Sequence, residues 1–189
     1  MILILGRSGV GKDTLADKLA QHGFKVVKSY TTRPRRTAHE DTHLFLDKEH
    51  ADIMPSKAAT TVINGYEYFT TYSQIENTMK ADKSVYIIDK AGIDCLVDHF
   101  GPKPFVIIEL FADDKETRKR AIARADDRTK EAEVFTKRRL SEDAEFNAFD
   151  EAIDENDCYK DIPVWPLVNN FTEQGMNNIV RLIERVGMH

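Results

Sequence analysis

The chain has 189 residues, of which 41% are hydrophobic and 31% charged, and this composition suits one domain with one sizeable core. The formal net charge of −5 at pH 7 argues against a nucleic-acid-binding protein, because affinity for the phosphate backbone depends largely on an excess of Lys and Arg. Cys95 and Cys158 lie far apart without metal-ligand spacing, so neither a disulfide framework nor a zinc site is expected. The apolar start at residues 1–5 is too short for a signal peptide. We therefore expect a cytoplasmic protein that binds neither nucleic acid nor membrane.

Continuous apolar runs alternate with helical patterns along the chain. Residues 1–5 predict a buried strand, which leads through a glycine-rich loop at residues 6–11 into a helical pattern at Leu15 and Leu19. Further apolar runs predict strands at residues 24–27, 85–88, 105–111 and 164–168. Helices are predicted at residues 73–81, 91–100, 115–125, 131–149 and 173–186. Because continuous runs are typical of parallel strands buried on both faces, this order predicts an α/β fold with a parallel sheet core flanked by helices.

Residues 43–72 do not follow this alternation. The aromatic residues Tyr66, Tyr68 and Phe69 and the turn pair Asn64-Gly65 predict a small β-rich insertion there. The whole chain, residues 1–189, is then a single domain in four approximate parts. These parts are a core at residues 1–36 and 73–114, an insertion at 37–72, helices at 115–149 and a C-terminal part of the core at 150–189.

The segment from Gly6 to Lys12 has the GxxxxGK spacing of a Walker A phosphate-binding loop, or P-loop. Its glycines let successive backbone N–H groups surround phosphate oxygens, and Lys12 is expected to reach the terminal phosphates. The helix that follows offers its N-terminus to the same anion. The sequence therefore predicts an ATP site formed by Gly6, Ser8, Gly9, Val10, Gly11, Lys12, Asp13 and Thr14.

Asp13 stands where the motif usually has the Ser or Thr that binds Mg²⁺, and the first hydroxyl follows at Thr14. Two interpretations stay open. The Asp13 carboxylate is a ligand of Mg²⁺, directly or through water, or it is an acidic residue that stabilises the first turn of the helix through its dipole.

The segment from Ser29 to Arg36 reads Ser-Tyr-Thr-Thr-Arg-Pro-Arg-Arg, and its guanidinium groups predict a second anion site. It resembles the Ser-x-Thr-Thr-Arg-x-Pro-Arg segment of the guanylate kinase family, whose arginines bind the phosphate of the acceptor nucleotide. The resemblance implies that Ser29, Arg33 and Arg36 bind the acceptor. Because the proline is displaced, the choice between Arg35 and Arg36 stays open.

Further segments resemble the same family in the same order. Residues 65–70, Gly-Tyr-Glu-Tyr-Phe-Thr, are similar to its Gly-x-Tyr-Tyr-Gly-Ser/Thr segment, which implies that Tyr68 contacts the acceptor phosphate and Thr70 the base. His43 stands where the family has another tyrosine that binds the acceptor phosphate. Asp89 matches the second acid of the family's Asp-x-Asp-x-Gln-Gly segment and is expected to contact the acceptor base or metal-bound water.

The family's lid arginines correspond to Arg120, Arg124 and Arg139, and Asn169 matches an Asn near the ATP adenine. The resemblance implies a P-loop kinase fold with an acceptor-binding insertion and a helical lid. It implies that Lys12, Arg33, Arg124 and Arg139 are catalytic, with ATP and Mg²⁺ as donor and cofactor. Phosphoryl transfer mainly requires alignment and neutralisation of charge, which these residue types supply.

One departure concerns the acceptor base. The family's Glu that reads guanine lies shortly before the second Tyr, in a stretch that is Ala58-Ala59-Thr60-Thr61 here. Glu40 or Glu67 is the alternative carboxylate. The resemblance therefore implies phosphorylation of GMP or dGMP, with another nucleoside or deoxynucleoside monophosphate as the alternative acceptor. A kinase for a non-nucleotide phosphorylated metabolite and a non-catalytic protein-binding module of the same fold are further alternatives.

Overall fold

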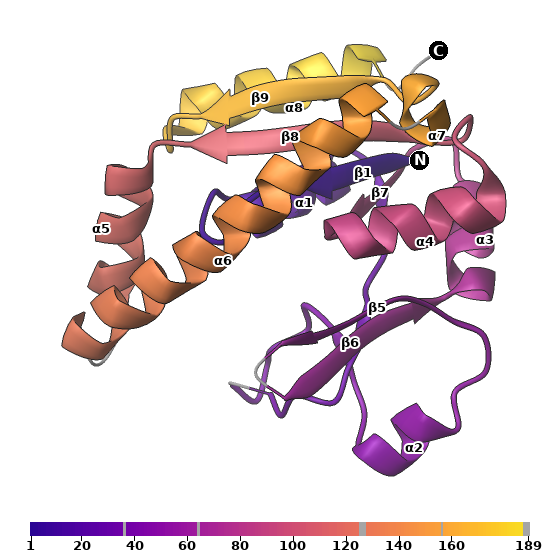
Figure 1. The fold of residues 1–189 in the computed structure, drawn as a ribbon, viewed down its shortest axis with the longest axis horizontal. Helices are drawn as coiled ribbons and strands as arrows, with labels where there is room; N and C mark the ends of the chain where they lie inside the picture. Colours follow the sequence, from indigo (N-terminus) through magenta and orange to yellow (C-terminus); the bar gives the residue numbers. More distant parts are fainter. Residues whose placement is uncertain (36, 64, 125–127, 156, 187–189) are drawn as a thin grey trace.

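A computed structural model describes residues 1–35, 37–63, 65–124, 128–155 and 157–186. Its centre is a five-stranded sheet in the order β2-β7-β1-β8-β9, with all neighbouring strands parallel (Figure 1). The strands are β2 (Lys25–Val26), β7 (Ser84–Ile87), β1 (Ile2–Leu5), β8 (Val106–Ala112) and β9 (Val164–Asn169). The loop that follows β1 leaves the carboxyl end of the middle strand. It therefore lies at the centre of the carboxyl edge of the sheet, where open α/β sheets bind their ligands.

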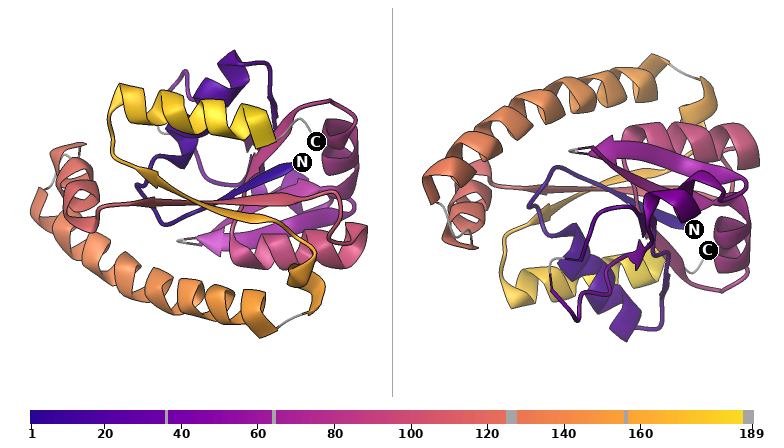
Figure 2. Two further views of the ribbon diagram at one scale, coloured as in Figure 1. Left: turned by 90° about the horizontal axis from the view of Figure 1, so that it is seen from above. Right: turned by 90° about the horizontal axis from the view of Figure 1, so that it is seen from below.

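Helices cover both faces of this sheet (Figure 2). On one face, α1 (Lys12–Gln21) and α8 (Glu173–Val186) pack against a core that includes Ile2 and Ile4. On the other face, α4 (Lys90–Phe100) packs against a core that includes Leu3 and Leu5. Burial of both faces explains why the strand sequences are continuously apolar.

A smaller four-stranded sheet lies beside the core in the order β4-β3-β6-β5. Its strands are β3 (Tyr30–Thr31), β4 (Leu44–Phe45), β5 (Lys57–Ile63) and β6 (Tyr66–Thr71), and the short helix α2 (Lys48–Asp52) precedes β5. The fully buried Phe69 stacks on Tyr30 with 5.3 Å between ring centroids. A bulge in β5 gives Ala59 a φ of +49° and lets its N–H donate to Cys95 Sγ of α4 at 3.4 Å. The bulge thus joins the second sheet to the core.

Two helices follow the carboxyl end of β8 and lie side by side, α5 (Asp114–Arg124) and α6 (Arg128–Glu155). The sequence of α6 contains neither Gly nor Pro, which is consistent with its 28-residue length. The chain returns to the core through α7 (Asp157–Lys160), β9 and α8. Helix α3 (Tyr72–Met79) connects the second sheet to β7. Within the described residues, no helix is long and apolar enough to cross a membrane.

The structure confirms the predicted α/β fold, with its parallel five-stranded sheet, flanking helices and second β-rich unit. The main differences lie in short elements and in helix ends. The strands β3 and β4 have two residues each and α2 has five, which is too short for a periodic pattern to indicate them. Helix α6 begins before the predicted residue 131 and ends after the predicted residue 149. The second sheet takes in β3, which lies before residue 37, and the four-part division of the domain stays a prediction.

Candidate nucleotide site

The P-loop connects β1 to α1 at the carboxyl edge of the sheet. Gly9 and Gly11 both have positive φ, +82° and +101°. A Cβ atom on Gly9 would lie 2.8 Å from Thr117 Cγ2, and one on Gly11 would lie 2.5 Å from Asn169 Nδ2. Both positions therefore require glycine for backbone conformation and for close packing. The result is a tight loop that ends at the first turn of a helix, an arrangement suited to binding an anion.

A cavity of about 420 Å³ opens beside this loop. The loop and the first turns of α1 contribute Gly9, Gly11, Lys12, Asp13, Thr14 and Lys18 to its wall. The other side is formed by Arg120 of α5 and by residues around the start of α8, namely Asn169, Phe171, Thr172, Glu173 and Met176. The cavity has the size of a small-molecule site and brings together the predicted ATP-binding residues Gly9, Gly11, Lys12, Asp13, Thr14 and Asn169.

Asn169 lies under the loop and is almost completely buried. Its Nδ2 donates to the Val10 carbonyl oxygen at 2.8 Å, and its Oδ1 accepts the Phe171 N–H at 2.9 Å. In this structure the Asn169 amide therefore links the P-loop to the turn before α8. Asn169 also lines the cavity, and its place beside ATP stays a prediction.

Lys12 is turned back onto the P-loop. Its Nζ donates to the Gly6 carbonyl oxygen at 2.5 Å and to the Arg7 carbonyl oxygen at 3.0 Å. An ammonium group on a flexible stem exchanges such carbonyl partners for phosphate oxygens at little cost in geometry. The Lys12 ammonium group therefore lies on the P-loop, and its contact with the terminal phosphates stays a prediction.

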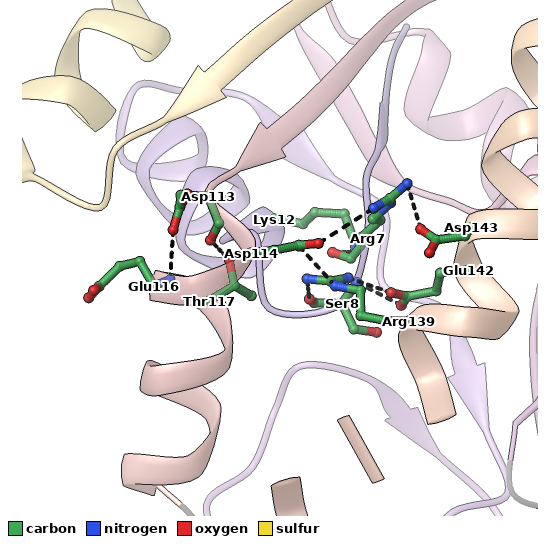
Figure 3. Close-up of polar contacts among 10 residues, drawn as sticks. All are labelled: Arg7, Ser8, Lys12, Asp113, Asp114, Glu116, Thr117, Arg139, Glu142 and Asp143. Carbon is green, nitrogen blue, oxygen red and sulfur yellow. Dashed lines mark hydrogen bonds and ion pairs between the residues drawn. The ribbon is translucent and has the colours of Figure 1, made fainter. Parts of the chain in front are cut away.

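Arg139 of α6 lies directly against the P-loop (Figure 3). Its Nη2 donates to the Ser8 carbonyl oxygen at 3.1 Å and its Nη1 to Glu142 Oε2 at 2.5 Å. Its Nε lies 3.0 Å from Asp114 Oδ1 without the alignment of a hydrogen bond. The side chain is 10% exposed, so the structure places this predicted catalytic arginine at the rim of the phosphate loop.

Glu142 brings a carboxylate onto the same loop. Its Oε1 accepts the Ser8 N–H at 2.8 Å, while its Oε2 pairs with Arg139. Burial acts to raise the pKa of Glu142, but the hydrogen bonds from Ser8 and the charge of Arg139 outweigh it and lower the pKa overall. Glu142 is therefore an anion held on a P-loop N–H, next to an arginine expected to bind phosphate.

Arg7 makes a second connection between the P-loop and the helices α5 and α6 (Figure 3). Its Nη2 lies 2.8 Å from Asp143 Oδ1 and its Nη1 lies 3.8 Å from Asp114 Oδ2. The guanidinium also lies over the ring of Phe146, with its Cζ 5.6 Å from the centroid. Two arginines thus hold the P-loop to α6. Arg7 belongs to the loop and Arg139 belongs to the helix.

Four of the predicted acceptor residues, Ser29, Arg33, His43 and Tyr68, contact one another in two pairs linked by the Tyr68 and His43 rings. Arg33 Nη2 donates to Glu40 Oε1 at 2.6 Å and Arg33 Nε donates to Tyr68 Oη at 3.2 Å. The hydrogen bond to Glu40 raises the pKa of Arg33 above its ordinary value, against the opposing effect of burial. Ser29 Oγ lies 2.9 Å from His43 Nδ1, and the His43 ring packs edge-on against Tyr68 with 5.4 Å between centroids.

Thr70 and Asp89 have structural partners. Thr70 is fully buried, and its hydroxyl donates to Gln74 Oε1 at 2.6 Å. Asp89 is the N-cap of α4 and accepts the Gly92 N–H at 2.8 Å. Their roles in acceptor binding stay predictions.

In the stretch that replaces the family's guanine-reading Glu, Ala58 and Ala59 are buried in the core, whereas Thr60 is exposed. Ala59 is buried, and a Cβ on Gly92 of α4 would lie 3.0 Å from its Cβ. Both alternative carboxylates are paired with cations, Glu40 with Arg33 at 2.6 Å and Glu67 with Lys57 at 2.6 Å. Among the described residues considered for this role, none presents a carboxylate without a cationic partner.

Two predicted residues lie outside the described part of the structure, Arg36 entirely and Arg124 in its side chain. Arg35 is described, and its guanidinium donates to the Glu40 carbonyl oxygen and lies 4.3 Å from the Phe45 centroid. Sequence reasoning missed Glu142 and Phe171. The spacing of Arg139 and Glu142 on one helix indicates their ion pair, but nothing local indicates that Glu142 reaches Ser8, 134 residues away.

The parallel sheet, the P-loop between β1 and α1 and the second sheet beside them define a P-loop kinase fold. The guanylate kinase family model matches residues 1–163, and the chain belongs to this family. A solved guanylate kinase from Anaplasma phagocytophilum is similar in fold, with a TM-score of 0.64 and 18% identity over 100% of this chain and 86% of that one. An uncharacterized protein from Eubacterium ventriosum ATCC 27560 has a TM-score of 0.47 and 16% identity, with 98% of each chain covered. A comparison with curated proteins finds no match.

Proposed function

We propose that the protein transfers the γ-phosphoryl group of ATP to a nucleoside monophosphate. The observation that carries this proposal is the P-loop beside a cavity of about 420 Å³, with Arg139 hydrogen-bonded to Ser8 of the loop. The Arg33, Tyr68 and His43 cluster supports it by offering a second anion site on a separate sheet. A donor phosphate and an acceptor phosphate each have a group of suitable residues.

The protein contributes binding and charge rather than covalent chemistry. Lys12 and the P-loop N–H groups hold the donor phosphates, while Arg33 and Tyr68 hold the acceptor phosphate. Arg139 turns from Glu142 to the transferring group and neutralises its charge, and Arg124 is proposed to act with it. The acceptor phosphate oxygen is already anionic at pH 7, so no general base is required.

The donor set around the cavity fits a hard cation. Asp13 is exposed in the first turn of α1, and Asp13 and Thr14 both line the cavity. These oxygen ligands suit Mg²⁺, which binds through one or two carboxylates and substrate phosphates. We propose Asp13 as the protein ligand, and the metal would supply charge neutralisation between the donor phosphates.

GMP and dGMP are the first acceptors to test because the chain belongs to the guanylate kinase family. The paired state of Glu40 and Glu67 and the position of Ala59 suggest a weak preference for guanine. A site that lacks a charged partner for the base gives up about 1.5–3 kcal/mol of discrimination. Another ribo- or deoxyribonucleoside monophosphate is therefore the alternative acceptor.

The test is release of ADP by the purified protein with ATP and Mg²⁺, screened against all ribo- and deoxyribonucleoside monophosphates. Stimulation by at least one acceptor, abolished in Lys12→Ala, is the expected result. No stimulation by any acceptor, together with absence of ATP binding, would overturn the proposal and favour a non-catalytic binding module.

A further inference from the structure

Phe171 borders the cavity from the turn between β9 and α8. Its ring is partly exposed, and the Arg120 guanidinium lies over it with Cζ 4.7 Å from the ring centroid. A guanidinium is a planar group, so this contact shows that one face of the ring accepts a flat partner inside the cavity wall.

The backbone at Phe171 is unusual for a bulky residue. Its φ is +59°, in the left-handed region that normally favours Gly or Asn. In the described part of the chain, the other non-glycine residues with positive φ are Ser56 and Ala59, which have small side chains. A large aromatic side chain is thus kept at a position where its backbone is strained, and such strain is common at ligand clamps.

The position of the ring is tied to the phosphate loop. The Phe171 N–H donates to Asn169 Oδ1 at 2.9 Å, and Asn169 Nδ2 donates to the Val10 carbonyl oxygen at 2.8 Å. Two consecutive hydrogen bonds therefore fix the turn that carries the ring relative to the loop that would hold the phosphates. A ligand with phosphates at one end and a flat ring at the other would meet both features in one cavity.

We infer that Phe171 is the stacking surface for the base of the donor nucleotide, and that the base takes the place of the Arg120 guanidinium on the ring. This inference rests on the proposed function, because it assumes that the donor phosphates lie in the P-loop. An aromatic face stacks on a nucleobase but adds no affinity for a polyphosphate that carries no base. The ring therefore makes the site selective for nucleotides over inorganic polyphosphate.

The experiment compares the parent protein with Phe171→Leu and Phe171→Trp by calorimetric titration with ATP and with inorganic tripolyphosphate, both with Mg²⁺. Leu keeps an apolar side chain at the same strained backbone position but has no aromatic face, and Trp keeps the face. Base stacking on an aromatic residue predicts that Phe171→Leu binds ATP roughly ten- to hundredfold more weakly. Tripolyphosphate binding should be unchanged in both variants, and Phe171→Trp should bind ATP within about threefold of the parent. Thermal unfolding of each variant checks that the fold is retained.

Equal ATP affinity of Phe171→Leu and the parent would overturn the inference while leaving the kinase proposal intact. Equal loss of ATP and tripolyphosphate affinity would overturn it as well, because the ring would then support the loop rather than bind the base. Absence of ATP binding by the parent protein would overturn the proposed function itself, and this inference with it.

Discussion

The contact of Glu142 with the P-loop leads to a prediction in which stability and nucleotide affinity change in opposite directions. In Glu142→Gln, the amide oxygen can still accept the Ser8 N–H, but the charge that pairs with Arg139 is lost. The Glu142 side chain is 13% exposed and lies 2.5 Å from Arg139 Nη1. A charge-assisted hydrogen bond of this kind contributes about 1.5–3 kcal/mol, so we expect the free energy of unfolding to fall by about 1–2 kcal/mol. In a protein of this length, that loss lowers Tm by about 2–8 °C.

ATP binding should instead become tighter. A phosphate at the P-loop meets the negative charge of Glu142, and Arg139 must leave Glu142 before it can contact the phosphate. Without that charge, the repulsion and the competing ion pair both disappear. We expect the Kd for ATP to fall by about three- to thirtyfold, which corresponds to about 0.7–2 kcal/mol.

Denaturant unfolding and calorimetric ATP titration measure the two effects on the same samples. Glu133→Gln is the matched control, because Glu133 is exposed on the same helix and the substitution removes the same charge from the protein. If Glu142→Gln bound ATP as weakly as the parent or more weakly, Glu142 would be a support for Arg139 and not a competitor of phosphate.

The same variant has a predicted pH dependence. Because the pKa of Glu142 is lowered in the folded protein, its contribution to stability is complete above the pKa of the unfolded chain. The contribution is lost as the pH falls through the lower folded-state pKa. The difference in Tm between the parent and Glu142→Gln should therefore be largest near neutral pH and shrink below about pH 4. A difference that stays constant down to pH 3 would contradict this account.

Four further predictions concern the proposed site. Lys12→Ala and Arg33→Ala should each reduce turnover at least about tenfold, because each removes a charge contact to a phosphate, and a normal rate in either would remove that residue from the mechanism. Asp13→Ala should raise the Mg²⁺ concentration required for half-maximal activity, whereas an unchanged requirement would leave Asp13 as a helix first-turn acid. Gly11→Ala should lower the free energy of unfolding by about 1–3 kcal/mol, measured in urea, because of its positive φ and its 2.5 Å approach to Asn169. Gly23→Ala is the control, since Gly23 also has positive φ but no atom within 4 Å of the added Cβ, and an equal loss would show that packing contributes nothing at Gly11.

Much of the fold was open to prediction because its signals are local. Residues 1–5 and 105–111 are continuous apolar runs, and both are strands of the parallel sheet. The glycine spacing between Gly6 and Gly11 predicted the tight loop, and both residues approach neighbouring atoms too closely for a side chain. The two-residue strands of the second sheet escaped prediction because β3 is a strand through its pairing with β6, and β4 through its pairing with β3, rather than through their own sequences.

The candidate site was predicted less completely. Arg33 and Tyr68, which the resemblance assigns to one acceptor site, are joined by a hydrogen bond, and their acceptor role stays a prediction. The partner of Arg33 on its other side, Glu40, was considered as a reader of the base, and the structure pairs it with the guanidinium instead. The linear sequence does not reveal which cationic side chain will pair with a given carboxylate, because the pairing depends on the path of the intervening chain.

The sequence alone determined the class of fold and the phosphate loop, because glycine conformation and strand burial leave patterns within a few residues. Tertiary structure alone decided which residues from distant segments contact the phosphate loop and line the cavity beside it. Glu142 meets Ser8 because α6 packs against the P-loop, and two hydrogen bonds through Asn169 join the turn that carries Phe171 to Val10. Such contacts join segments more than a hundred residues apart, and packing rather than local chain chemistry selects them.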